Sequence, residues 1–294
     1  MASACCLTSC SSKEDGADDE PTNTEQGEQN KYKGAPAGKN LNDVCKVKSI
    51  KSTYDEYVFE YDEHNRVTKI HDGEETHLYQ YSEDKIMLLQ DSGQEGTYQF
   101  ILTDGLITEM IDRDGRKTTY TYDKEGHLVK AQKHYFYLTG NDLSENTIDI
   151  VFEWEDGDIK QIKQHYVSDH EGKWQYVFDS ASTWGYSDVI NLNPISNHYS
   201  SMNEGMGKVS WLSEDFKYPG IIDIILSTQG YMGNTRNKHL PILQSYSYNS
   251  YQNQPGYEHT WQDSRRDECS YETDDKGRVI SFAQSNHKTL ITWY

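Results

Sequence analysis

The chain has 294 residues, which is enough for one large β domain or two small ones and for a sizeable buried core. It carries 28 Lys and Arg against 48 Asp and Glu, and a net charge of −20 argues against nucleic acid as a partner because such a surface repels phosphate backbones. Only 34% of the residues are hydrophobic, yet there are 23 Tyr, 6 Trp and 7 Phe, so apolar burial must depend on aromatic rings. The longest apolar stretches, 86–89 and 221–226, fall far short of the roughly 20 residues of a membrane-spanning helix.

The first ten residues, MASACCLTSC, are small and apolar and resemble the end of a secretion signal. Within them, Leu7-Thr8-Ser9-Cys10 resembles the bacterial lipobox, whose Cys becomes the lipid-carrying N-terminus of the mature protein. The resemblance implies that Cys10 is lipidated and holds the chain at a membrane. The basic region that usually precedes such a motif is missing, which a start codon assigned too far downstream would explain. The alternative is a coincidental Cys in a disordered tail.

The next segment, residues 11–40, has almost no large apolar side chains and many Glu, Asp, Gln, Gly and Pro. It cannot bury enough surface to offset the entropy lost on ordering, so we expect a disordered acidic tether. Its start, Ser11-Ser12-Lys13-Glu14-Asp15, resembles the export tag of Bacteroidetes lipoproteins that face the cell exterior, with an ordinary acidic linker as the alternative. Residues 41–294 are then expected to form a single domain.

Two of the five Cys, Cys45 and Cys269, belong to this domain. They could form a disulfide, since an exported protein meets an oxidising compartment, but the sequence does not give the distance between them. Two Cys without a nearby pair of His do not make a zinc site. We expect neither a metal nor a cofactor.

A repeated unit begins at residue 57. Its copies cover 57–70, 77–89, 97–111, 118–131, 149–162 and 268–282. In most of them aromatic residues alternate with polar ones, as at Tyr120 and Tyr122, which is the period of a β-strand. An Asp follows, then Gly or Asn three residues later, as at Asp123 and Gly126, and then a second apolar run. Asp starts such a turn and Gly accepts a positive φ, so each unit predicts a β-hairpin.

Consecutive hairpins whose turns alternate between two edges predict an antiparallel meander. A flat meander of ten or more strands would twist severely and leave its ends open, so we expect a curved sheet or a barrel. The apolar runs are about 6–8 residues long, short of the ~9–11 of a membrane barrel strand, and the face opposite the rings is polar. The sequence therefore predicts a soluble barrel rather than a pore.

The repeat also carries a family resemblance. The pattern YxYDxxGR, present as YTYDKEGHLVKA (120–131) and less fully as YETDDKGRVISF (271–282), is similar to the YD repeat of Rhs-type bacterial surface proteins. It also resembles an uncharacterised family of Bacteroidetes lipoproteins whose domain has a porin-like fold. The resemblance covers about residues 50–180 and 265–294, although the units vary in length and most lack the Arg before the first Tyr. It implies a fold and a lipid anchor and brings no known catalytic residues.

Residues 183–264 break the repeat, because Gly and Pro are frequent there and the period of two is weak outside QSYSYNSY. We predict an irregular insertion, and such insertions commonly carry binding surfaces. Exposed rings stack on the C–H faces of sugars, and the candidate glycan-binding residues are Trp184, Tyr186, Trp211, Tyr218, Tyr257 and Trp261. The alternative is that these rings belong to the core and cap an open end of the barrel.

Motifs of enzymes are absent from the sequence: there is no HExxH, GxSxG, Walker loop or GxGxxG. The leading prediction is therefore a non-enzymatic, lipid-anchored outer-membrane protein that faces the cell exterior and binds a glycan. The first alternative is a structural or protein-interaction module of an envelope complex, which engages its partner through open strand edges or the tether. A glycoside hydrolase comes third.

Overall fold

Sixteen antiparallel strands close into one barrel. The computed structural model describes residues 46–51, 56–71, 73, 76–90, 97–139, 142–190, 230–233, 237–276, 278–284 and 287–294. Each strand pairs with the strands before and after it in the chain, and β1 pairs with β16. The predicted fold class, an all-β meander of consecutive hairpins, is confirmed, and the meander closes. Among the described residues, none forms a helix of the length and apolar character that crossing a bilayer requires.

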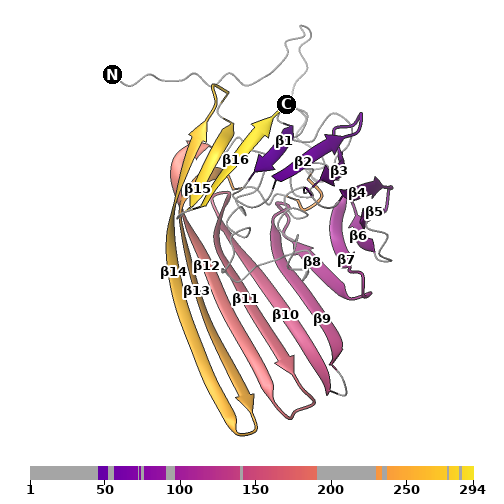
Figure 1. Cartoon of the computed structure of the whole chain (residues 1–294), viewed down its shortest axis with the longest axis vertical. Coiled ribbons are helices and arrows are strands. Elements are labelled where there is room, and N and C mark those ends of the chain that lie inside the picture. Colours follow the sequence, from indigo (N-terminus) through magenta and orange to yellow (C-terminus); the bar gives the residue numbers. More distant parts are fainter. Residues whose placement is uncertain are drawn as a thin grey trace, which may run out of the picture. The chain divides into compact units, whose positions relative to one another are not determined.

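The strands fall into two length classes. Ten strands have five to seven residues: β1 Val47–Lys51, β2 Glu56–Tyr61, β3 Val67–His71, β4 Thr76–Tyr81, β5 Lys85–Gln90, β6 Thr97–Thr103, β7 Leu106–Ile111, β8 Lys117–Tyr122, β15 Val279–Gln284 and β16 His287–Trp293. Six have 12 to 17 residues: β9 Leu128–Thr139, β10 Asp142–Glu155, β11 Asp158–Asp169, β12 Gln175–Ile190, β13 His239–Gln254 and β14 Tyr257–Thr273. Figure 1 shows the six long strands continuing past the short ones at one end. We call this part the extension (residues 134–139, 142–150, 164–180 and 246–268).

The barrel interior is filled by side chains from every second strand position. In β2, Tyr57 and Phe59 are buried, whereas Glu56 and Glu60 are exposed. The same alternation buries Phe100 completely in β6. Because fully burying one such side chain contributes about 2 kcal/mol, this interior supplies most of the driving force for closing the barrel.

The chain that leads into β13 also packs against this interior. Tyr231 is buried, its ring stacks on Tyr81 with centroids 5.9 Å apart, and its carbonyl accepts a 2.8 Å hydrogen bond from the amide of Ile107. Gly233 follows with φ +68, where a Cβ would lie 2.3 Å from the carbonyl oxygen of Gly126. Only Gly can fit at this close approach between two backbone segments.

Rings near the ends of even-numbered strands tie neighbouring strands together at one rim of the barrel. Each donates a hydrogen bond of 2.6 to 2.9 Å to the carbonyl of the first or second residue of the preceding strand: Tyr61 to Val47, Tyr81 to Val67, Tyr122 to Ile107, Trp154 to Leu128, Tyr186 to Ile159 and Trp293 to Val279. A β-bulge lies next to several of these rings, for example between Thr121 and Tyr122. Bulges bend and twist a strand locally, which turns the ring toward the rim carbonyl.

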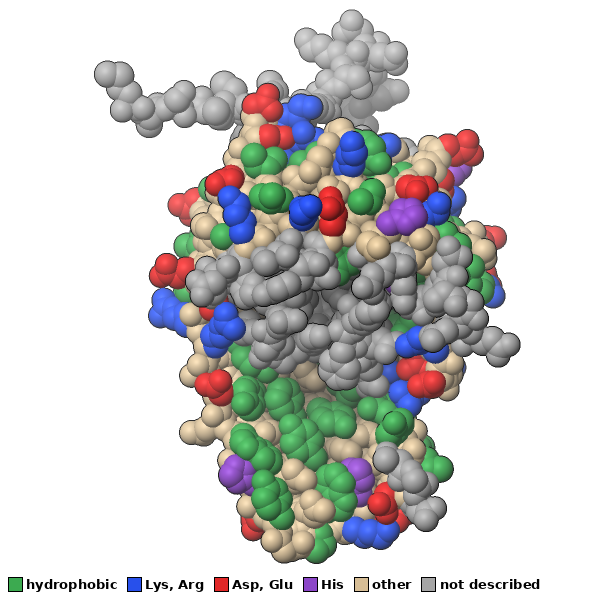
Figure 2. All heavy atoms as spheres, in the orientation of Figure 1, with side chains coloured by type: hydrophobic (Ala, Val, Ile, Leu, Met, Phe, Trp, Pro, Cys, Tyr) green, Lys and Arg blue, Asp and Glu red, His purple; other side chains and the backbone are tan. Residues whose placement is uncertain are grey.

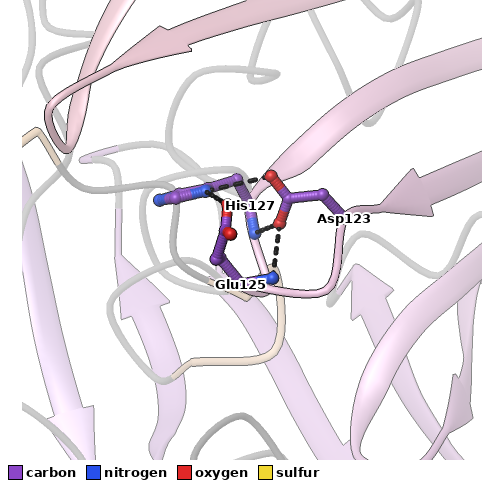
Figure 3. Close-up of side chains that lie close together, drawn as sticks. All are labelled: Asp123, Glu125 and His127. Carbon is purple, nitrogen blue, oxygen red and sulfur yellow. Dashed lines mark hydrogen bonds and ion pairs between the residues drawn. The ribbon is translucent and has the colours of Figure 1, made fainter.

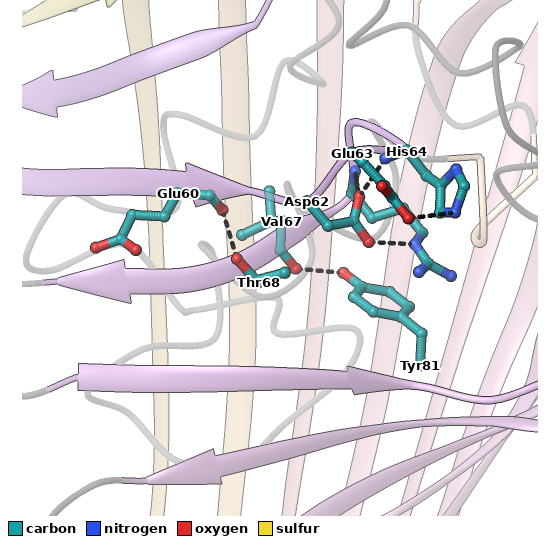
Figure 4. A network of polar contacts seen from close by, with 8 residues as sticks. Glu60, Asp62, Glu63, His64, Val67, Thr68 and Tyr81 are labelled. Atoms are coloured by element: carbon teal, nitrogen blue, oxygen red, sulfur yellow. Dashed lines mark hydrogen bonds and ion pairs between the residues drawn. The ribbon is translucent and has the colours of Figure 1, made fainter.

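The turn that follows each such ring explains why the repeat also contains Asp, a Gly or Asn, and a basic residue. One carboxylate oxygen of Asp62 accepts hydrogen bonds from the amides of His64 and Arg66, both at 2.9 Å, and Asn65 takes the positive φ of 58°. The second oxygen accepts the Nε–H of Arg66 at 2.8 Å, and the guanidinium lies 4.6 Å from the centre of the Tyr81 ring (Figure 4). Burial acts to raise the pKa of Asp62, but the hydrogen bonds from Arg66 outweigh it and hold the pKa below its usual value.

Two predictions from the sequence need correction. The irregular insertion over 183–264 is wrong at the ends that the structure describes, because residues 183–190 belong to β12 and 239–264 lie almost entirely in β13 and β14. Both faces of these strands carry many Ser, Asn, Gln and charged residues, so hydrophobic alternation is weak although the backbone is regular. Strand runs of about 6–8 residues are also too short for β9 to β14. The predicted signal (1–10), the tether (11–40) and residues 191–229 lie outside the described residues.

The rim hydrogen bonds can be tested one at a time. Tyr122→Phe removes the hydroxyl that lies 2.7 Å from the carbonyl of Ile107 and leaves the ring in place. We expect the free energy of unfolding in urea to fall by about 1 kcal/mol, the usual net value of such a bond. Tyr251→Phe is the matched control, because the Tyr251 hydroxyl bonds the exposed Glu258, and should leave the urea midpoint unchanged. Equal midpoints for both variants would contradict a stabilising rim.

The pH dependence of stability gives the same variant a second readout. Burial raises the pKa of the Tyr122 phenol above its ordinary value of about 10. Above pH ~10 the unfolded chain therefore releases a proton that the native state keeps, so the free energy of unfolding falls as pH rises; below pH ~10 both states hold the proton and nothing changes. The alkaline decline should be shallower in Tyr122→Phe.

Candidate ligand-binding face

The inner face of the extension is lined by aromatic side chains. Side chains that face the core at the base of β9 to β14 alternate up each strand, so the same side of the sheet continues past the barrel. The rings on this side define what we call the ring-lined face: Tyr135, Tyr137, Tyr166, Tyr176, Phe178, Tyr246, Tyr248, Tyr257, His259 and Trp261. Figure 2 shows hydrophobic side chains gathered over the end of the molecule to which the long strands extend.

Rings and small polar residues alternate across the strands. Ser250 on β13 lies directly between Phe178 on β12 and Trp261 on β14. One step toward the barrel, Tyr248 lies opposite Ser180. Ser250 is only 4% exposed and Ser180 only 8%, so neighbouring side chains cover these hydroxyls. The small residues leave each ring room to lie against the sheet.

Several of the rings contact one another. Phe178 stacks on Tyr248 with centroids 5.6 Å apart, and Tyr248 contacts Tyr246 at 6.1 Å. On β14, His259 meets Trp261 edge to face at 4.2 Å. Such pairs hold each other in defined orientations, which reduces the entropy that a ligand must offset when it binds.

Polar groups at the margin of this layer are held by hydrogen bonds. The hydroxyl of Tyr166 donates to Oδ1 of Asn146 at 2.8 Å, and Nδ2 of the same Asn donates to Oγ of Ser144 at 3.1 Å. Asn146 is 3% exposed and Ser144 is 4% exposed. The face thus presents apolar rings, and the buried hydroxyl and amide groups beneath them hold these rings in place.

Exposure of the rings increases toward the tip of the extension. Tyr246, near the barrel, is 7% exposed, whereas Tyr257 at the tip is 49% exposed and Tyr137 is 50% exposed. Tyr248 and Trp261 are intermediate. A flat ligand can therefore reach ring faces over the outer part of the extension, while the inner rings belong to the core.

Two of the predicted glycan-binding residues, Tyr257 and Trp261, lie on the ring-lined face. Trp184 and Tyr186 lie at the base instead: Trp184 packs against the hydrophobic core, and the Tyr186 hydroxyl donates to the carbonyl of Ile159 at 2.7 Å. The predicted Trp211 and Tyr218 lie outside the described residues.

The structure therefore separates the predicted residues into two places. Trp184 lies opposite Gln244, and Gln244 lies opposite Asp267. Asp267 and Trp261 are six positions apart on β14, which is about 20 Å along a strand. Trp184 and Trp261 cannot stack on the same sugar ring.

Most rings of this face were not among the predicted site residues. Their signal was the period of two in QSYSYNSY (244–251), which places Tyr246 and Tyr248 on one side of a strand. The partner strand is marked by QYVF (175–178), where Tyr176 and Phe178 alternate in the same way. The sequence does not show that these runs pair with each other, and that pairing creates the face.

The predicted disulfide has one member in the described residues. Cys269 is half-buried on β14, and burial raises the pKa of its thiol to about 12. As a thiol, Cys269 would stay protonated at neutral pH and would be a poor nucleophile. Cys45 lies outside the described residues, and its pairing with Cys269 stays a prediction.

One cluster could be mistaken for a metal centre. Asp123, Glu125 and His127 have potential ligand atoms within 4.8 Å of one another (Figure 3). The Asp123 carboxylate, however, already accepts the amides of Glu125 and His127 at 2.9 and 2.8 Å, and its second oxygen lies 3.1 Å from Nδ1 of His127. The His127 ring stacks on Trp154 with centroids 4.7 Å apart.

The same turn recurs with Arg in place of this His. Asp274 accepts the amides of Lys276 and Arg278, and Arg278 lies over the ring of Trp293. Arg cannot serve as a metal ligand because it keeps its proton. The contacts of His127 are therefore those of a repeat turn.

Stability measurements distinguish the turn from a metal site. Asp123→Ala removes an acceptor of two backbone amides and should lower the free energy of unfolding by about 2 kcal/mol. Glu125→Ala, which removes an exposed side chain, should change it by less than about 0.5 kcal/mol. A zinc-dependent rise in melting temperature that both variants abolish would reject the turn interpretation.

Three comparisons place these features among known proteins. Residues 103–133, which include this turn, match the model of the RHS repeat family, and this confirms the predicted YD-repeat resemblance for that hairpin. No curated protein matches the chain. Two similar solved structures are described as porin-like proteins, one from Bacteroides vulgatus (13% identity, TM-score 0.43, 84% of this chain and 97% of the other) and one from Bacteroides uniformis (12%, 0.48, 84% and 96%). Both carry the porin-like description that the sequence resemblance named.

Proposed function

We propose that the chain is a non-enzymatic binding protein whose ring-lined face takes a soluble glycan. The observation that carries this proposal is the layer of partly exposed rings on one side of the extension, with the amides of the partly exposed Gln252 and the exposed Gln254 beside them. Sugar rings present C–H groups on their faces and hydroxyls on their edges. An aromatic face and a fixed hydroxyl or amide are the partners that these two kinds of group need.

The dimensions of the face favour an oligosaccharide over a single sugar. The rings come from five strands, β9 and β11 to β14, and β10 lies among them. Strands lie about 4.8 Å apart, so six strands give a surface roughly 24 Å wide before curvature. Several sugar units of one oligosaccharide can contact this surface at the same time, and each contact adds to the affinity of the protein for that oligosaccharide.

A glycoside hydrolase is the less favoured reading of the same face. Its chemistry needs two carboxyl groups roughly 5 to 9.5 Å apart on either side of the scissile bond. On the inner side of β14, Asp263 lies opposite Tyr248, whereas Asp267 is buried and held by Nε of Arg265 at 2.7 Å. Asp267 is thus engaged in an ion pair, and we propose binding without hydrolysis.

The outer face of the extension supports attachment to the outer membrane through the lipid of Cys10 rather than insertion of the strands. Cross-strand polar pairs lie on this side of the sheet, with Lys163 and Glu153 next to the extension and His165 and Asp179 within it, both pairs at 2.7 Å. A shallow depression nearby is lined mainly by polar and charged side chains. Such a surface suits water, because charged side chains on a lipid-facing strand cost several kcal/mol each. The exterior orientation rests on the export-tag resemblance.

A protein-interaction module is the second candidate, and one observation favours it. The long strands leave parts of β9 and β14 beyond the reach of β8 and β15. Strands with one unpaired side can accept another strand.

Binding to an array of soluble polysaccharides tests the glycan proposal. We expect at least one to bind, and Tyr248→Ala or Trp261→Ala to weaken binding about tenfold because each removes one stacking ring. Tyr251→Ala is the matched control, since Tyr251 is on the same strand as Tyr248 but on the opposite face. If no polysaccharide binds, or if all three variants bind equally, the proposal is wrong.

Radiolabelled palmitate tests the anchor. Cells that express the chain with its native upstream region should incorporate label into the protein, and Cys10→Ala should abolish it because the acceptor thiol is gone. Cys6→Ala keeps Cys10 and should retain the label. Label that persists in Cys10→Ala would reject lipidation at this residue.

A further inference from the structure

The extension has an open edge on β14. Residues 257–268 pair with β13 along their whole length, whereas β15 pairs with β14 only over residues 269–273. Within the part of the chain that the structure describes, residues 257–268 are therefore paired on one side. An edge that is paired on one side can accept another strand, and native proteins cover it, shorten it or use it for association.

We propose that this edge pairs with the same edge of a second copy of the chain. The two strands run antiparallel, and the two-fold axis passes between the Gln262 residues of the two copies, which lie directly opposite each other. The pairing joins two six-stranded extensions into one twelve-stranded sheet. The contact is the same on both copies, so it closes as a dimer and does not continue into a fibre.

Geometry limits the registers that such a dimer can adopt. Residues directly opposite in an antiparallel pair lie on the same face of the sheet. About a two-fold axis, this requires that opposite residues differ by an even number of positions. Two registers keep nearly all of residues 257–268 in the pair: one centred on Gln262 and one centred on Asp263.

The charges of the strand favour the first register. Centred on Gln262, each Glu258 lies opposite Arg266 of the second copy, and Thr260 lies opposite Ser264. Centred on Asp263, this carboxylate would face its own copy, and Glu258 would face Glu268. Directly opposite like charges destabilise a sheet, whereas opposite charges stabilise it.

The side chains that would meet are free to do so. Glu258 and Arg266 are both exposed and lie on the outer face of β14. Arg266 lies opposite Ser245 on β13, and within the described residues it forms no ion pair. Glu258 accepts a 2.9 Å hydrogen bond from Tyr251 and keeps a second carboxylate oxygen for a partner.

The inner side of the strand is also compatible with this register. Trp261 would lie opposite Asp263 of the second copy, and Tyr257 opposite Asp267. These two pairs place no like charges together, and the remaining inner pair sets His259 opposite Arg265, whose guanidinium is already paired with Asp267 of its own strand. The two ring-lined faces would then lie side by side on the same surface of the joined sheet, because the two-fold axis is perpendicular to it.

Sedimentation velocity at about 0.15 M salt, where the Debye length is ~8 Å and the overall charge of the two copies is largely screened, measures the dimerisation. We expect a concentration-dependent shift from monomer to dimer. Glu258→Arg or Arg266→Glu alone should weaken it roughly tenfold, because each change creates two like-charge pairs. The double variant Glu258→Arg/Arg266→Glu should restore it. Lys163→Glu makes the same change in charge as Arg266→Glu, away from the edge, and should leave dimerisation unchanged.

A cysteine at the axis tests the register. Gln262→Cys places two thiols directly opposite, at the separation of a cross-strand disulfide, whereas Thr260→Cys places its two copies four positions apart. Mild oxidation should give covalent dimers with Gln262→Cys far faster than with Thr260→Cys, and both variants contain the same native Cys. A monomer at every concentration, larger oligomers, a dimer insensitive to the charge changes, or equal cross-linking of the two variants would overturn the proposal. Glycan binding by a monomer would leave the proposed function intact.

Discussion

The geometry of the barrel rim depends on the hydrogen bond between a ring at the end of one strand and a carbonyl at the start of its neighbour. The rim of a barrel is where strand pairing stops, so its carbonyls would otherwise be left without partners near the core. Tyr and Trp can satisfy these carbonyls because their rings are apolar and pack against the core, while the Tyr hydroxyl or the Trp indole N–H donates a hydrogen bond. Tyr61 and Trp293 make the same bond at opposite ends of the chain, on either side of the strand pair that closes the barrel. The repeat therefore specifies the hydrogen bonds of the rim as well as the turn of each hairpin.

The hairpins could be predicted because each of their parts has a local cause. Alternating rings define a strand, Asp fixes the turn through its side chain, and Gly or Asn accepts the positive φ, as Asn65 does at 58°. Strand length has no such local signal. The sequence LTGNDLSENT (138–147) lies between two copies of the repeat, yet its described residues belong to β9 and β10. Polar residues on both sides of a strand remove the hydrophobic period on which the prediction relied.

The binding face could be predicted only in part for a related reason. Trp184 and Trp261 both face the inner side, and the sequence around them gives no difference between a core ring and an exposed ring. The difference comes from what lies across the barrel. Near the base, the short strands and the buried Tyr231 complete the core, whereas among the described residues only the long strands continue beyond it (Figure 1). Whether a ring is exposed depends on whether its position along the strand lies opposite the short strands of the barrel. This is a property of the tertiary structure and not of the local sequence.

Lengthening six strands has two consequences that belong together. Rings on the inner side of the extension form a surface instead of part of the core. Beyond the last residues that pair with β8 and β15, the strands β9 and β14 are edge strands. A closed barrel without the extension would have neither this ring surface nor these edge strands. The chain tolerates the edge of β14 by placing charged residues along it, including Asp263, Arg265 and Asp267 on the inner side, which oppose indiscriminate strand addition. Charges that block most partners can still admit one whose charges are complementary, and a strand that carries Glu258 and Arg266 symmetrically about Gln262 is complementary to itself.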